Sequence, residues 1–176
     1  MSEGHLPFSQ GLTQPDEQHL KAAQGWLELG NVLDACAELD SIKPQDRAHP
    51  DVLKLRLRID MKGGKWDSAA QLAESLSRLL PRDAEVFVWR SECARRMPDG
   101  GILRALELLL DVSKDFPDDA LVPFTLARYN TLLENLVEAV NWLNITFDVA
   151  QKNGSLEAWK QRARDEPDLA PLFLKL

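Results

Sequence analysis

The histidines and cysteines of this chain do not form a catalytic or metal-binding pattern. The three histidines, His5, His19 and His49, include no pair at the spacing of a metal-ligating motif. Neither Cys36 nor Cys93 lies in a nucleophile-elbow pattern, and no serine does. The sequence therefore predicts no enzyme active site, no metal and no cofactor.

Two other local patterns are typical of ligand-binding loops but lack the rest of the motif. Gly100 and Gly101 precede an expected helix, as in a phosphate-binding loop, yet no strand comes before them and no Gly-Lys-Ser/Thr triplet follows. The aspartates between residues 111 and 119 lack the spacing of a calcium loop. We interpret the glycines as a turn and the aspartates as a helix end followed by an acidic turn.

Composition and charge are those of an acidic globular protein. The chain has 176 residues, of which 44% are hydrophobic, and its 21 basic and 28 acidic residues give a formal charge of −7. This charge argues against nucleic-acid binding, which needs a basic face. No apolar run approaches the roughly 18 residues of a membrane helix, and the first residues lack the basic and apolar regions of a signal peptide. We expect a cytoplasmic protein with no membrane or nucleic-acid partner.

An alanine recurs along the chain at a nearly constant interval. Successive copies are 34, 36 and 34 residues apart, at Ala35, Ala69, Ala105 and Ala139. The residue three positions before each alanine is apolar in all four cases: Val32, Trp66, Ile102 and Leu136. A period of about 34 residues is typical of a helix–turn–helix repeat. The interval therefore predicts four helix pairs.

The predicted elements follow from this register. We expect a mobile tail over residues 1–14, helix pairs at about 15–43, 50–80, 83–115 and 119–150, and a capping helix with a C-terminal tail over 155–176. Residues Asp51–Lys62 alternate apolar and polar side chains, which is typical of a strand. No neighbouring strand is expected to pair with them, and the repeat requires a first helix there, so we predict a helix.

Two stretches carry a resemblance to a known family. GKWDSAAQLAESLSRLLP and ENLVEAVNWLNITF resemble the second-helix half of the tetratricopeptide repeat (TPR), and the resemblance covers roughly residues 16–150. With the terminal EPDLAPLF, the chain also resembles short bacterial TPR-repeat-containing proteins. The resemblance implies an all-α fold, a right-handed α-solenoid of about four helix pairs with a capping helix. It also implies a bacterial source and a concave groove lined by the first helix of each pair.

That analogy identifies candidate binding residues. The positions expected to face the groove are Leu20, Gln24 and Leu27 in the first pair, Lys54, Arg58 and Met61 in the second, Val88, Glu92 and Arg95 in the third, and Phe124, Arg128 and Thr131 in the fourth. They include four cations and one carboxylate, so we expect the groove to bind an acidic or C-terminal carboxylate segment of another protein. The family's carboxylate-clamp pattern is absent, because Leu20 and Gln24 occupy its first two positions.

The expected function is a non-enzymatic scaffold for protein–protein interaction, and two alternatives stay open. One is a small chaperone-like repeat protein that shields an apolar segment of a client. The other is a self-assembling module that forms weak homo-oligomers through the C-terminal tail, with Leu169, Leu172, Phe173 and Leu176 as the pairing residues. A mainly apolar groove favours the first alternative, and a mass that depends on concentration favours the second.

The repeat register generates a first prediction, at the alanine of the second pair. We expect Ala69→Leu to lower the free energy of unfolding by about 1–3 kcal/mol, because a larger side chain at the contact between paired helices forces them apart. Thermal unfolding of the variant measures the effect. An unchanged melting temperature would show that the register is wrong.

Overall fold

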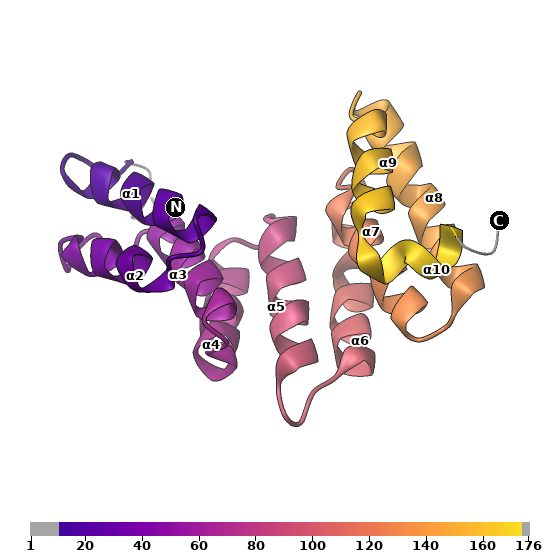
Figure 1. Ribbon diagram of the computed structural model, residues 1–176, viewed down its shortest axis with the longest axis horizontal. Coiled ribbons are helices and arrows are strands. Elements are labelled where there is room, and N and C mark those ends of the chain that lie inside the picture. The colour runs from indigo at the N-terminus through magenta and orange to yellow at the C-terminus, as the bar shows by residue number, and fades with distance from the viewer. Residues whose placement is uncertain (1–10, 174–176) are drawn as a thin grey trace, which may run out of the picture. The chain divides into compact units, whose positions relative to one another are not determined.

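The computed structural model describes residues 11–173, and its regular elements are all helical (Figure 1). The chain divides into two compact units, which we call unit 1 (residues 1–79) and unit 2 (residues 80–176). No strand occurs in the described part of either unit, so the predicted all-α fold class is confirmed. Each unit is considered by itself.

Unit 1 consists of two helix pairs joined by short connections. The first pair is α1 (Asp16–Glu28) and α2 (Val32–Ser41), and the second is α3 (Pro50–Lys62) and α4 (Trp66–Leu79). The helices of each pair pack against one another, and α3 also contacts α1 and α2. The core between them contains Ala23, Leu27, Ala35, Leu39, Ile42, Val52, Leu55 and Ile59.

The strand-like segment is a helix, as the repeat predicts. Pro50 occupies its first turn and the side chain of His49 caps it by accepting the backbone N–H of Asp51, an arrangement that favours helix initiation. Because α3 contacts α1, α2 and α4, it buries more than one stripe of its surface. Leu55 lies in the core shared with α1 and α2, while Leu57 is fully buried outside that cluster. This two-sided burial explains the alternating pattern.

Unit 2 begins with two further helix pairs. They are α5 (Ala84–Arg96) with α6 (Ile102–Val112), and α7 (Leu121–Leu132) with α8 (Leu136–Lys152). A short 3-10 helix, η1 (Ser113–Asp115), extends α6. Helix α7 contacts α5, α6 and α8, and residues 122–127 and 129–131 are all buried. A helix enclosed in this way has few positions left for a ligand.

The chain ends with three short elements that pack on the last helix pair. They are α9 (Leu156–Asp165), the 3-10 helix η2 (Pro167–Leu169) and α10 (Ala170–Phe173). Leu169 and Leu172 are buried in one cluster with Phe124 and Ala127 of α7. Both leucines are therefore covered by their own chain, which corrects the expectation that they pair separate chains. Leu176 lies outside the described residues.

The repeat alanines occupy equivalent places in the fold. All four are fully buried on the second helix of their pair, and so are the residues twelve positions before three of them: Ala23, Leu57 and Ala127. Ser91 is fully buried at the corresponding place in the third pair. The two-residue insertion in that pair forms the turn after α5, where Gly101 donates its N–H to the Ala94 carbonyl. At the amino end, Leu12 packs against the unit 1 core, so part of the expected 1–14 tail is packed chain.

The turn after α5 generates a second prediction. A Cβ atom on Gly100 would lie 1.9 Å from the carbonyl oxygen of Ala94, so the backbone must shift to accept any side chain. We expect Gly100→Ala to lower the free energy of unfolding by about 1–3 kcal/mol, measured by urea denaturation. Gly25→Ala is the matched control. It lies inside α1 with no atom within 4 Å of the added Cβ, and we expect it to stabilise by about 0.5–1 kcal/mol. Equal effects at the two positions would contradict the prediction.

Candidate binding faces on the first helices

The twelve predicted groove residues divide between the two units. The unit 1 face consists of Leu20, Gln24 and Leu27 of α1 with Lys54, Arg58 and Met61 of α3. The unit 2 face consists of Val88, Glu92 and Arg95 of α5 with Phe124, Arg128 and Thr131 of α7. Helices α1 and α3 contact one another, and so do α5 and α7. Each face is therefore a surface of two neighbouring first helices. One groove shared by all four first helices stays a prediction.

The unit 1 face has two cations beside apolar side chains. Lys54 and Arg58 of α3 are half-buried, and so are Leu20 and Met61. Gln24 is exposed and donates a hydrogen bond to Glu28 at 3.1 Å. The face can therefore offer the guanidinium donors of Arg58 next to apolar contacts.

Leu27 does not belong to the unit 1 face. It is buried in the core of unit 1, so its selection as a groove residue is wrong. A residue at the last turn of α1 is enclosed by the helices that pack around it, and the helical period alone does not reveal that.

The unit 2 face contains a network of charges around Glu92. Arg95 donates two hydrogen bonds to the Glu92 carboxylate, at 3.0 and 2.5 Å, and the Arg96 Nε lies 3.5 Å from it. The Tyr129 hydroxyl donates to the same carboxylate at 3.2 Å and lies 3.0 Å from the Ser91 hydroxyl. Burial raises the pKa of Tyr129, and the nearby carboxylate of Glu92 raises it further. Tyr129 is consequently a neutral donor that holds Glu92 in place.

Arg128 binds two carboxylates from the end of the chain. We call residues 166–173 the C-terminal segment. The Arg128 Nη2 donates to Asp168 at 2.7 Å, and the Arg128 Nε lies 3.2 Å from a Glu166 oxygen. All three side chains are between 20% and 26% exposed. Solvent screens such pairs less than it screens fully exposed ones. The carboxylates that contact Arg128 therefore come from its own chain.

Phe124 is enclosed by side chains of α9, the helix that precedes the C-terminal segment. Its ring centroid lies 5.2 Å from that of Trp159 on α9, and the guanidinium of Arg162 lies over both rings, 5.0 and 4.8 Å from their centroids. This geometry is a cation–π contact. With an exposure of 1%, Phe124 is a core residue, and its selection as a groove residue is wrong.

Thr131 and Val88 also serve the packing of unit 2. Thr131 is buried, and its hydroxyl donates to the Ala127 carbonyl at 2.9 Å. Val88 is half-buried and packs against the unit 2 core. Thr131 is therefore unavailable to a ligand, and the charged residues Glu92, Arg95 and Arg128 define what the unit 2 face can bind.

Cys93, His19 and His49 carry reactive or metal-binding side chains, and each is buried or contacts its own chain. Burial raises the pKa of the Cys93 thiol to about 12, so it is a poor nucleophile at neutral pH. His19 lies 2.8 Å from Glu38, and His49 caps α3. Residues 11–173 contain no group of three or more His, Cys, Asp or Glu side chains that could hold a metal ion. Across that same range, no helix is long and apolar enough to span a membrane.

Sequence reasoning missed the partners of the charged residues. Ser91 and Tyr129 were not predicted to support Glu92, and Glu166 and Asp168 were not predicted to meet Arg128. The only available signal was two carboxylates beside leucines in the terminal EPDLAPLF. That pattern shows an amphipathic segment, but it does not show which helix the segment meets.

Comparison with known proteins supports the fold. No family model matches the chain, and no curated protein matches it. The crystal structure of a thermophilic TPR protein from Thermus thermophilus is similar, with a TM-score of 0.66 and 18% sequence identity. The match covers 91% of this chain and 94% of that one. The predicted TPR-like fold is therefore confirmed.

The network around Glu92 generates a third prediction. We expect Tyr129→Phe to lower the free energy of unfolding by about 1–3 kcal/mol, because the variant loses a partly buried hydrogen bond to a charged group. Urea denaturation measures the loss. Ser91→Ala keeps the bond from Tyr129 to Glu92, so its effect is expected to be smaller. If Tyr129→Phe unfolds like the unaltered protein, the hydroxyl does not support the network.

Proposed function

We propose that this chain, which has the fold of a tetratricopeptide-repeat protein, is a non-enzymatic scaffold that binds an acidic segment of a partner protein on its first-helix faces. A stack of helix pairs presents the outer side chains of the first helices as a preformed surface. Binding to a preformed surface avoids part of the ordering cost of association. The fold alone does not specify which chemical groups this surface recognises.

One observation carries the proposal. Arg58 and Arg128 each stand eleven residues before a repeat alanine, so they occupy the same position in two repeats. Arg128 binds the carboxylates of Glu166 and Asp168. Within residues 11–173, Arg58 has no ion pair or hydrogen bond through its guanidinium. The chain thus contains a filled carboxylate site in unit 2 and an equivalent cation in unit 1 that an outside carboxylate can reach.

The surroundings of Arg58 suit a carboxylate that is followed by apolar side chains. Arg58 is half-buried beside Lys54, Leu20 and Met61 on the same face. A hydrogen bond to a charged group contributes about 1.5–3 kcal/mol when it is partly shielded from water. The formal charge of −7 repels an acidic partner at long range, so the local contacts must provide the attraction.

A second candidate rests on a different surface. Leu29 and Leu33, on either side of the turn between α1 and α2, are 78% and 82% exposed. Exposed leucines at neighbouring positions favour the chaperone-like alternative, in which an apolar client segment covers this turn. Binding by that route is insensitive to Arg58, whereas binding on the unit 1 face depends on it.

The proposal generates a fourth prediction. We expect Arg58→Glu to weaken capture of the partner from a lysate of the source organism by about tenfold or more, because it replaces an attraction with a repulsion. Arg78→Glu makes the same change of charge on α4, at an exposed arginine paired with Glu74. Capture by this control is expected to be unchanged. If Arg58→Glu retains the same partners in the same amounts, the unit 1 face is not the binding surface.

A further inference from the structure

The C-terminal segment lies on the unit 2 face in the manner of a bound peptide. It presents two carboxylates separated by one residue, Glu166 and Asp168, and both contact the guanidinium of Arg128. A leucine follows the second carboxylate directly and is fully buried, and Leu172 is 7% exposed. Charged contacts at the start of the segment are therefore followed by apolar contacts, and a peptide ligand can supply both kinds.

The segment is attached to α7 by side chains. Its backbone bonds stay local, such as the Leu169 N–H to the Glu166 carbonyl at 3.0 Å and the Ala170 N–H to the Pro167 carbonyl. In the described part of the chain, the hydrogen bond that joins the segment to α7 runs from Arg128 to Asp168. Undocking the segment therefore breaks an ion-pair cluster and exposes two leucines, without disrupting the backbone hydrogen bonds of α7.

The charges on α5 and α7 favour exchange of the C-terminal segment for another acidic segment over undocking that leaves the site empty. An empty site would leave the half-buried guanidinium of Arg128 without its carboxylates, which is costly. Arg95 contributes to the same field. Its hydrogen bonds to Glu92 raise the pKa of Arg95, and attraction from the Glu92 and Asp168 carboxylates adds to this effect. A second acidic segment is the natural replacement.

We propose that the unit 2 face is a docking site for a partner segment with two carboxylates, separated by one residue and followed by a leucine, and that the C-terminal segment is a built-in ligand which this partner displaces. The inference rests on the proposed function, in that the partner is acidic, and it adds the spacing of the groups that are recognised. A tethered ligand has an effective concentration in the millimolar range. Only a segment that reproduces the same contacts can compete with it.

The test uses the full-length chain and a fluorescein-labelled peptide with the sequence of residues 165–173, DEPDLAPLF. All variants carry Arg58→Glu, so that the unit 1 face does not contribute. Fluorescence anisotropy compares Arg58→Glu alone with the same chain carrying Glu166→Gln and Asp168→Asn. We expect the peptide to bind at least about tenfold more tightly to the second protein, because the tethered segment has lost its charged contacts. Adding Arg128→Gln is expected to abolish this gain.

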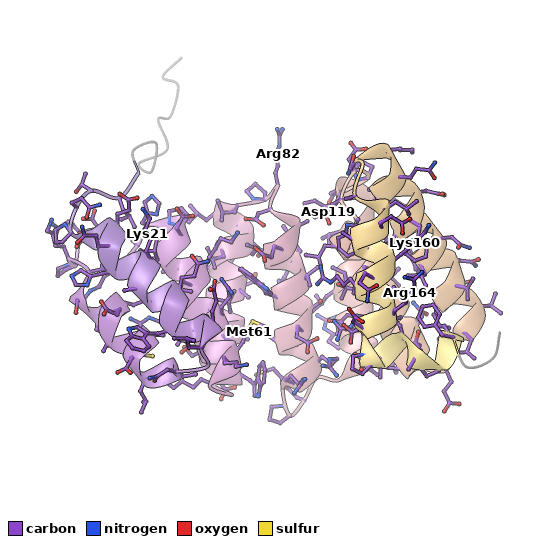
Figure 2. All side chains as sticks on the ribbon, turned by 45° about the horizontal axis from the view of Figure 1, so that its top comes forward. Lys21, Met61, Arg82, Asp119, Lys160 and Arg164 are labelled. Atoms are coloured by element: carbon purple, nitrogen blue, oxygen red, sulfur yellow. The ribbon has the colours of Figure 1, made fainter. Side chains whose placement is uncertain are left out.

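The matched control neutralises two carboxylates on α9. Glu157→Gln with Asp165→Asn, in the same Arg58→Glu chain, removes an equal charge from exposed residues that bond to Lys160 (Figure 2) and Gln161. No gain in peptide affinity is expected there. An equal gain in the control would mean that net charge sets the affinity, and no gain in the Glu166→Gln, Asp168→Asn chain would mean that the segment does not occupy a ligand site. Either result overturns the inference.

A second measurement guards against an effect of altered folding. In the unaltered chain, the unlabelled peptide at about millimolar concentration is expected to speed hydrogen exchange at the backbone amides of residues 168–170 and Leu172, since displacement exposes them. Unchanged exchange at saturating peptide would show that the segment is a permanent part of unit 2. The proposed function fails on a different result, which is unchanged capture of the partner by the Arg58→Glu variant. Failure of the proposed function and failure of this inference can therefore be told apart.

Discussion

Each helix pair in this chain depends on a small side chain where its two helices meet. The alanines at positions 35, 69, 105 and 139 are fully buried, and so are Ala23, Ser91 and Ala127 on the facing first helices. Interiors are packed closely enough that an added methylene group forces the backbone apart. The contact fixes the rotation of each first helix about its own axis. It thereby decides which side chains point into the core and which remain on the outer face.

One outer position shows how the repeat is put to different uses. Eleven residues before the alanine, or the corresponding place in the third pair, stand Gln24, Arg58, Glu92 and Arg128. Gln24 bonds to a neighbour on its own helix, and Glu92 is held by Arg95 and Tyr129. Arg128 binds the C-terminal segment. The guanidinium of Arg58 has no ion pair or hydrogen bond within residues 11–173, and the proposed function rests on that observation.

The acidic balance of the chain and its basic outer positions are compatible. Acidic residues outnumber basic ones in the whole sequence, yet the first-helix faces collect arginines and a lysine beside apolar side chains. A partly shielded arginine interacts more strongly with a carboxylate than an exposed one does. At Arg128 the carboxylates come from the C-terminal segment of the same chain. Two leucines of that segment also cover Phe124 and Ala127.

The sequence by itself determined the features that depend on neighbouring residues and on the repeat. These are the all-α class, the position of the repeat alanines and the helix at Pro50–Lys62. The resemblance to the repeat family also selected Arg58, Arg95 and Arg128 as groove residues, and that selection stays a prediction. Only the tertiary structure decided that Leu27, Phe124 and Thr131 are buried. The physical reason is distance along the chain: the segment that covers Phe124 begins about forty residues later. A helical period reports which face meets the paired helix, but it does not report what docks on the opposite face.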